Sequence, residues 1–170
     1  SHLFGYSTSY PEVYNTVIYQ VRLPRVLLGM MVGASLSISG ATFQGIFRNP
    51  LVSPYILGLS SGAAFGAALS LAFLPGASIQ FAAFFFSLLA VGLTYFMATT
   101  RKSTPVVSLV LAGVIVSAVF DALLALIQIA VSERALQSIV YWIMGRLGTA
   151  SWSKIHSAFP LFALGCTVML

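Results

Sequence analysis

The sequence has very few charged residues. Asp, Glu, Lys and Arg make up 6% of its 170 residues, with eight basic and three acidic side chains, whereas 59% of the residues are hydrophobic. A soluble domain carries about 25% charged residues, so this chain lacks the polar side chains that a water-facing surface needs. The shortage of charge excludes an ordinary soluble domain and predicts an integral membrane protein.

Side chains that perform catalysis or bind metals are also scarce. Cys166 is the single cysteine, which excludes an internal disulfide, and neither His2 nor His156 has a carboxylate or a cysteine close in sequence. The chain has no GxxxxGK[ST] loop for nucleotide phosphates. We therefore expect no catalytic residue, no metal site and no cofactor. We also expect no nucleic-acid partner, because the net charge of +5 lies in flanks and loops rather than in one patch.

Long apolar runs, in contrast, are abundant. About 20 apolar residues match the hydrocarbon thickness of a bilayer, and a single spanning segment must be helical to satisfy its own backbone. Membrane spans are predicted at about 26–47, 56–74, 79–98, 106–131 and 155–170. The expected fold is all-α, a polytopic transmembrane helical bundle in the lipid bilayer. Because the last run is still apolar at Leu170, we expect this chain to be a piece of a larger protein.

Small residues recur at every fourth position in the first two spans. Such spacing lets helix backbones approach closely, which is how helices associate within lipid. The first stripe is Gly29, Gly33, Ser37, Ala41 and Gly45, and the second is Gly58, Gly62, Gly66 and Ser70. The stripes favour a crowded bundle, and generic helix packing is the alternative interpretation.

Asp121 is the one acidic residue inside a predicted span. An ionised carboxylate there costs about 2.5–3.5 kcal/mol on insertion scales. Asp121 follows Gly113 and Ser117 at four-residue intervals, so it should face other helices or a water-filled path. Two interpretations stay open: a residue of a translocation path, or a protonated side chain that bonds to a neighbouring helix.

Several motifs occur together in a fixed order. They are RLPR at 22–25, SGATFQ at 39–44, RNPLVSP at 48–54, LAGV at 111–114 and YWIMGRLG at 141–148. In this combination the chain resembles the permease subunits of binding-protein-dependent ABC importers for iron–siderophore, haem and vitamin B12, the FecCD-type permeases.

The resemblance implies a type II ABC importer permease with about ten spans. This chain would supply the second to sixth spans, with the first span and the C-terminal half missing. It would pair with a second copy in a homodimer, in the cell (inner or cytoplasmic) membrane. The path between the two copies would carry an iron chelate (siderophore or haem) or cobalamin. Separate ATPase subunits would hydrolyse ATP, so this chain is expected not to be an enzyme, and an extracytoplasmic substrate-binding protein would deliver the cargo.

The resemblance also implies roles for two groups of residues. Arg48, Asn49, Pro50 and Leu51 would form a cytoplasmic gate or turn, in which proline stiffens the backbone and Leu51 excludes water. The alternative is a rigid turn alone.

Arg22 and Arg25 would lie at the outer rim and meet glutamates of the binding protein, and their alternative role is ordinary snorkelling at the interface. The positive-inside rule opposes this orientation. It counts three basic residues inside (Arg48, Arg101, Lys102) and five outside (Arg22, Arg25, Arg134, Arg146, Lys154). We follow the resemblance, because the count omits half of the expected protein.

Two other functions remain open at this stage. An ion-gradient-driven secondary transporter or channel would use Asp121 as its ion site. A structural membrane anchor would need neither Asp121 nor a gate.

Overall fold

The computed structural model describes residues 12–74, 76–99 and 105–169. His2, Arg101 and Lys102, which were considered above, lie outside these residues. The described part of the chain is helical and contains no strand, so the prediction of an all-α fold is confirmed.

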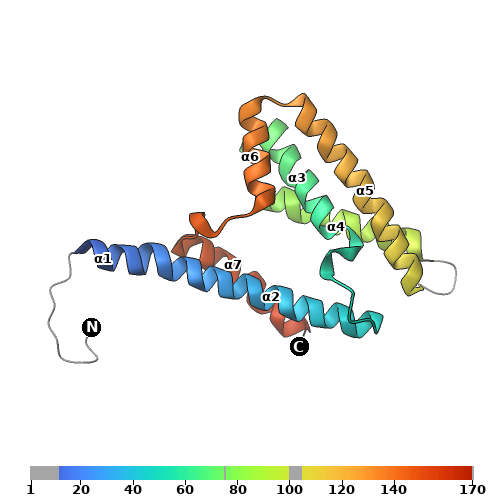
Figure 1. Ribbon diagram of the computed structural model, residues 1–170, viewed down its shortest axis with the longest axis horizontal. Helices are drawn as coiled ribbons and strands as arrows, with labels where there is room; N and C mark the ends of the chain where they lie inside the picture. The colour runs from blue at the N-terminus through green and yellow to red at the C-terminus, as the bar shows by residue number, and fades with distance from the viewer. Residues whose placement is uncertain (1–11, 75, 100–104, 170) are drawn as a thin grey trace. The chain divides into compact units, whose positions relative to one another are not determined.

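The elements follow the chain in a simple order (Figure 1). They are α1 (Glu12–Thr16), a π-helix (Val17–Arg22), α2 (Leu23–Phe47), a 3-10 helix (Pro54–Leu57), α3 (Leu59–Phe73), α4 (Ile79–Ala98), α5 (Val106–Ala130), α6 (Glu133–Met144), a second 3-10 helix (Leu147–Thr149) and α7 (Trp152–Met169). They form two compact units. The α2–α7 unit comprises Ser1–Thr42 and Arg146–Leu170, and the four-helix unit comprises Phe43–Gly145.

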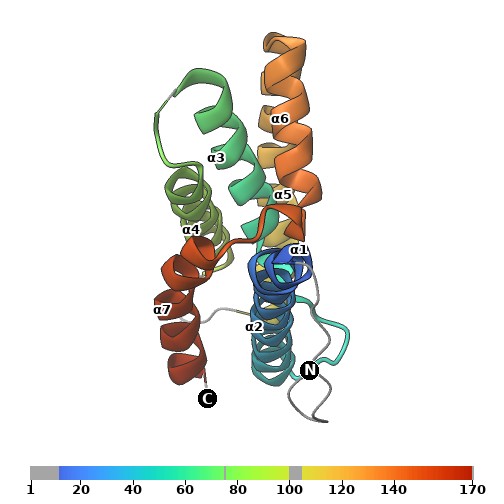
Figure 2. The same ribbon diagram turned by 90° about the vertical axis from the view of Figure 1, so that its left-hand side faces the viewer.

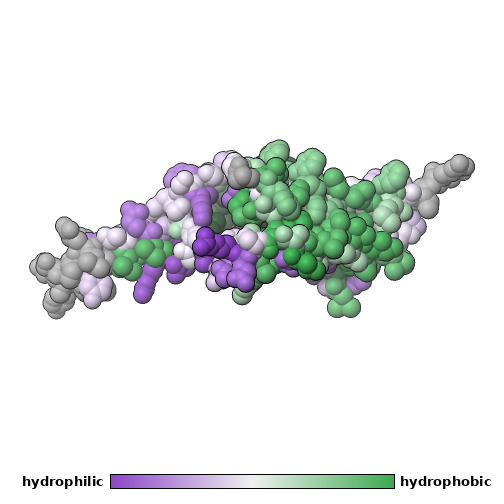
Figure 3. Space-filling model, turned by 90° about the horizontal axis from the view of Figure 1, so that it is seen from above, coloured by the Kyte–Doolittle hydropathy of each residue, from purple (hydrophilic) through white to green (hydrophobic). Residues whose placement is uncertain are grey.

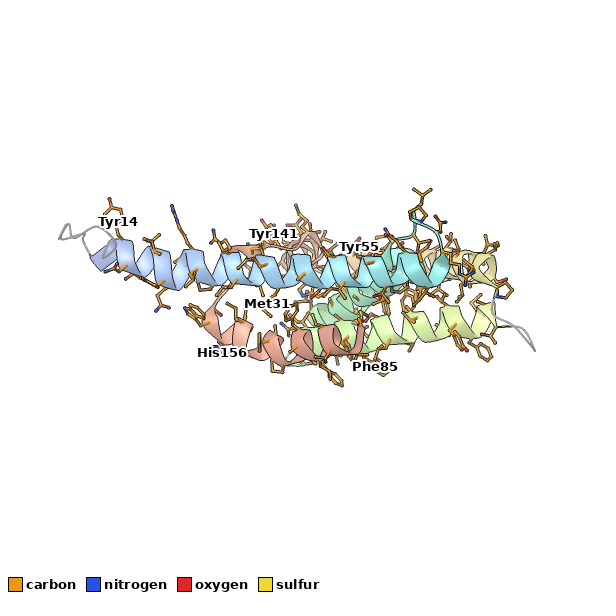
Figure 4. The ribbon with its side chains drawn as sticks, turned by 90° about the horizontal axis from the view of Figure 1, so that it is seen from below. Tyr14, Met31, Tyr55, Phe85, Tyr141 and His156 are labelled. Atoms are coloured by element: carbon orange, nitrogen blue, oxygen red, sulfur yellow. The ribbon has the colours of Figure 1, made fainter. Side chains whose placement is uncertain are left out.

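In the α2–α7 unit, the last helix runs beside the long N-terminal helix (Figures 2 and 4). An apolar groove separates the two helices, and Met31 of α2 lines it together with Ile155 and Phe159 of α7. Near the start of α7, the side chain of Leu147 lies 3.4 Å from the position that a Cβ on Gly29 would occupy. The segment that precedes α7 is therefore held against the N-terminal part of α2.

The N-terminal helix is longer than the first predicted span. It begins well before residue 26, and the helix from Tyr14 to Phe47 has 34 residues. A π-helical turn joins α1 to α2 without a break. At 1.5 Å per residue such a helix is about 50 Å long, whereas a hydrocarbon core is about 30 Å thick. One end of this helix therefore extends beyond the hydrocarbon.

The four-helix unit is built around aromatic rings and small residues. The ring of Phe65 on α3 packs edge-on against Phe86 of α4, with centroids 5.0 Å apart, and lies 5.6 Å from the ring of Phe120 on α5. A second cluster joins Ala68 and Ile127 to Ile139, which is 1% exposed. Ile139 belongs to α6, which was not among the predicted spans.

Glycines bring α3 and α4 into backbone contact. A Cβ on Gly62 would lie 2.6 Å from the carbonyl oxygen of Phe86, and one on Gly66 would lie 2.5 Å from that of Ala82. The second small-residue stripe is thus a site of close helix packing. The first stripe differs, because among the described residues no atom lies within 4 Å of a Cβ built on Gly33 or Gly45.

The outer surface of the four-helix unit is strongly apolar, as the space-filling view shows (Figure 3). Phe81 and Phe96 of α4 are 72% and 79% exposed, and Ile129 of α5 is 83% exposed. Helices α4 and α5 are each long and apolar enough to cross a membrane, as is the helix Tyr14–Phe47. Exposed aromatic and aliphatic side chains on such helices suit contact with lipid or with further helices.

Replacing Gly66 with alanine should destabilise the four-helix unit by about 1–3 kcal/mol, because the added methyl group would overlap the Ala82 carbonyl and force the helices apart. Gly92→Ala on α4 is the matched control, since no described atom lies within 4 Å of its new Cβ. The thermal midpoint of the purified full-length protein should fall for Gly66→Ala only. Equal midpoints for both variants would contradict the close contact.

Candidate functional site

The candidate site begins where α2 ends. Arg48 has a left-handed backbone conformation with φ of 49°. Its amide donates to the carbonyl of Gly45 at 3.3 Å, and the Asn49 amide donates to Gln44 at 3.2 Å. This pair of bonds is a Schellman motif, the usual helix terminus with a left-handed residue. Glycine normally occupies that position, and arginine does so here at a backbone cost of about 1–2 kcal/mol.

Side chains then replace the hydrogen bonds that the helix no longer supplies. The Asn49 Oδ1 accepts a hydrogen bond from the amide of Leu51 at 2.9 Å, which closes an Asx turn. The Gln44 amide nitrogen donates to the carbonyl of Pro50 at 3.1 Å. Asn49 therefore satisfies a freed backbone group, and Gln44 adds a second such bond.

The same turn directs two neighbouring apolar side chains in opposite ways. Leu51 is 89% exposed, whereas Val52 is only 5% exposed. Val52 is therefore buried, whereas Leu51 projects from the turn. An exposed apolar side chain on a rigid turn is available to contact another surface.

The predicted second span is interrupted at its start. Residues Pro54–Leu57 form a 3-10 helix, and Gly58 adopts a left-handed conformation with φ of 80° before α3 begins. Only glycine accepts this conformation without strain. The predicted helical run from residue 56 therefore begins as α-helix only at Leu59.

Helices α4 and α5 hold this interruption in place. The Thr94 hydroxyl donates to the Leu57 carbonyl at 3.0 Å, and Thr94 is completely buried. Gly113 of α5 lies directly against the carbonyl oxygen of Ile56, where a Cβ would not fit. The end of the connecting segment (residues 48–58), namely residues 56–58, is thus held against two other helices.

Asp121 lies two turns beyond this contact on α5. Gly113 touches the connecting segment, and the Ser117 hydroxyl oxygen lies 3.3 Å from the position of a Cβ on Gly58. Asp121 continues the same line, but its side chain is exposed on the four-helix unit, with the small exposed residues Ala118 and Ala125 on either side. This face of α5 therefore carries the carboxylate between two small side chains.

Arg22 and Arg25 belong to the α2–α7 unit, where both side chains are exposed. Arg22 is the last residue of the π-helix, and Arg25 lies in the first turn of α2. The indole N–H of Trp152 donates to the carbonyl of Tyr19 at 3.0 Å, so the start of α7 is bonded to the helix that carries both arginines. Sequence reasoning missed this contact, because 133 residues separate its partners and no local pattern joins them.

Metal-binding side chains do not gather in the described part of the chain. No group of three His, Cys, Asp or Glu residues is close enough there to hold a metal ion. The candidate residues are thus a turn and one exposed carboxylate in the four-helix unit and, separately, an exposed arginine pair in the α2–α7 unit.

Comparison with known proteins finds relatives along the whole chain. A model described as the FecCD transport family matches residues 1–170. The molybdate import system permease protein of Haemophilus influenzae is 42% identical over 162 residues, covering 93% of this chain and 48% of that protein. The cobalamin import system permease protein of Halobacterium salinarum is 40% identical over 162 residues, covering 94% of this chain and 44% of that protein.

A solved structure is similar as well. It is an inward-facing conformation of a metal-chelate type ABC transporter, with a TM-score of 0.81 and 39% identity over 93% of this chain and 51% of that one. The chain spans about half the length of the curated relatives that it matches.

Replacing Asn49 with alanine should loosen the connecting segment, because the Leu51 amide would lose its acceptor at a cost of about 1 kcal/mol. Asn49→Asp keeps the acceptor oxygen and serves as the control. Hydrogen exchange of the peptide containing Leu51, measured by mass spectrometry on the full-length protein, should quicken about fivefold in the alanine variant only. Unchanged exchange in that variant would show that the Asx turn does not stabilise the segment.

Proposed function

Because the chain belongs to the FecCD transport family, we propose that the whole protein is a membrane-spanning permease subunit of an ATP-binding-cassette importer. The family match along residues 1–170 is the observation that carries this proposal. Relatives named as import system permeases for molybdate and for cobalamin support it. An ion-gradient-driven transporter or channel finds no support among these relatives.

The chain is a multi-pass membrane protein of this family. Helices Tyr14–Phe47, Ile79–Ala98 and Val106–Ala130 have the length and composition to cross a bilayer. We place the protein in the cell (inner or cytoplasmic) membrane, where an importer works. A second copy would complete a homodimer, separate ATPase subunits would supply energy, and an extracytoplasmic binding protein would deliver the substrate.

The substrate that we propose is an iron chelate, either a siderophore or haem, or else cobalamin. Relatives named as an iron(3+)-hydroxamate permease of Bacillus subtilis and as a cobalamin permease support this range. The molybdate permease of Haemophilus influenzae widens the class to small metal oxyanions.

Arg48, Asn49, Pro50 and Leu51 are proposed as a cytoplasmic gate. A gate needs a part that keeps its shape and an apolar side chain that can meet another surface and exclude water. The hydrogen bonds of Asn49 give this turn its shape, and Leu51 is almost fully exposed. The 3-10 helix that follows this turn is bonded to α4 and packed against α5, so a movement of those helices would act on the connection that carries Leu51.

Reconstitution of the full-length protein tests the proposed function. Liposomes that contain the permease and its ATPase should take up substrate only when the binding protein and ATP are both supplied. Uptake that follows an ion gradient without ATP would overturn the proposal, and so would a complex in which the binding protein fails to stimulate ATP hydrolysis.

Reversing the charge of the arginine pair, with Arg22→Glu and Arg25→Glu together, should weaken association with the binding protein. Oppositely charged groups would become like charges, and the loss should be larger at low ionic strength because salt screens exposed pairs. Binding should be measured at low and at physiological salt, with Lys154→Glu as a control at another exposed cation. An affinity that stays unchanged at low salt would remove the pair from the docking surface.

Replacing Asp121 with asparagine should slow uptake in the full-length complex at least several-fold if the carboxylate faces the path ionised. The exposed position of Asp121 between the small side chains of Ala118 and Ala125 supports this role. Asparagine has nearly the shape and hydrogen-bonding capacity of a protonated aspartic acid. If Asp121 only packs against a helix, uptake should therefore survive the substitution. Wild-type uptake by this variant, at equal expression, would reject the pathway role.

A further inference from the structure

The π-helical turn before Pro24 leaves one carbonyl without its backbone donor. The Leu23 amide donates to the carbonyl of Ile18, five residues earlier, which is the π-helical spacing. In the same register, residue 24 would donate to the carbonyl of Tyr19. Proline has no amide hydrogen, so this bond cannot form. The Tyr19 carbonyl therefore needs a donor from elsewhere.

Trp152 provides that donor. Its indole Nε1–H, a group that only donates, lies 3.0 Å from the Tyr19 carbonyl oxygen. Trp152 is the first residue of α7, and its own carbonyl lies 2.8 Å from His156 Nδ1 one turn later. The indole thus takes the place of the amide hydrogen that Pro24 lacks. Here a side chain 133 residues away completes the hydrogen bonding of a helix.

The bond has a consequence for the two arginines. Arg22 ends the π-helix three residues after the capped carbonyl, Arg25 follows Pro24, and both side chains are exposed. Without the indole donor the Tyr19 carbonyl would be left unsatisfied, and the turn that carries both arginines would loosen.

We propose that Trp152 is a positioning residue for docking: its indole N–H caps the Tyr19 carbonyl beside Pro24 and so holds the turn that presents Arg22 and Arg25. This inference rests on the proposed function, because it assumes that the arginine pair meets an acidic partner. An aromatic residue that merely anchors a helix at the headgroups would not depend on whether residue 24 has an amide hydrogen.

Trp152→Phe tests the inference in the full-length importer, because phenylalanine keeps an aromatic ring and removes the donor. Association with the binding protein should weaken roughly two- to tenfold, the loss expected for one hydrogen bond. The dependence of affinity on salt should also become shallower, because misdirected arginines form fewer ion pairs. Partial unfolding would lower the fraction of active protein and leave that dependence unchanged.

A second substitution makes the test specific. Pro24→Ala introduces an amide hydrogen at position 24, which can donate within the helix in place of the indole. The double variant Trp152→Phe with Pro24→Ala should therefore recover most of the lost affinity. Trp142→Phe, which removes an indole N–H elsewhere in the chain, is the matched control and should bind normally.

The possible outcomes distinguish a failure of this inference from a failure of the proposed function. Loss in Trp152→Phe followed by recovery in the double variant supports the inference. Loss without recovery, or normal binding by Trp152→Phe, overturns it even when charge reversal of Arg22 and Arg25 still weakens docking. If charge reversal has no effect while ATP-driven uptake continues, the docking role and this inference both fail and the importer function stands.

Discussion

Backbone hydrogen bonding in an apolar environment is the constraint on which each irregular segment of this chain depends. Where a helix stops or changes its register, amide and carbonyl groups lose their partners, and lipid supplies none. Four side chains meet this need: Asn49 for the Leu51 amide, Gln44 for the Pro50 carbonyl, Thr94 for the Leu57 carbonyl and Trp152 for the Tyr19 carbonyl. Three of these bonds lie in the connecting segment and one beside the arginine pair, so polar side chains hold both irregular segments.

Close packing between helices is the second requirement, and small residues meet it because they let backbones approach each other. Helices in lipid gain little from burying apolar surface against each other, so they rely on backbone approach. Gly62 and Gly66 permit this approach between α3 and α4, and Gly113 permits it between α5 and the carbonyl of Ile56. The aromatic cluster around Phe65 then fills the wider space between the same helices. The connecting segment therefore rests on a rigid support.

Much of the fold could be predicted from the sequence, because apolar runs and four-residue spacing are local patterns. The helices Ile79–Ala98 and Val106–Ala130 agree closely with the predicted runs, and the Gly62–Gly66 spacing correctly indicated close packing. The π-helical entry to α2 was missed, because Pro24 normally marks a boundary and its compensating donor lies far along the chain.

Other features depend on tertiary contacts and were also missed. The interruption at Gly58 is one, since the residue fits a helical stripe as well as it fits a left-handed turn. Helix α6 is another, because its burial rests on the single side chain of Ile139. Within the candidate site, the Asx turn suits the residue type of Asn49, whereas the direction of Leu51 and the exposure of Asp121 depend on how the helices pack.

The left-handed arginine at the end of α2 has a consequence for the electrostatics of that helix. The C-terminus of a helix carries a partial negative charge of about half an electron, and a cation there gains about 0.3–1 kcal/mol. Arg48 follows the last residue of a 25-residue helix. Its charge thus offsets part of the backbone strain that a glycine would avoid. The same residue places a positive charge at the point where the chain turns.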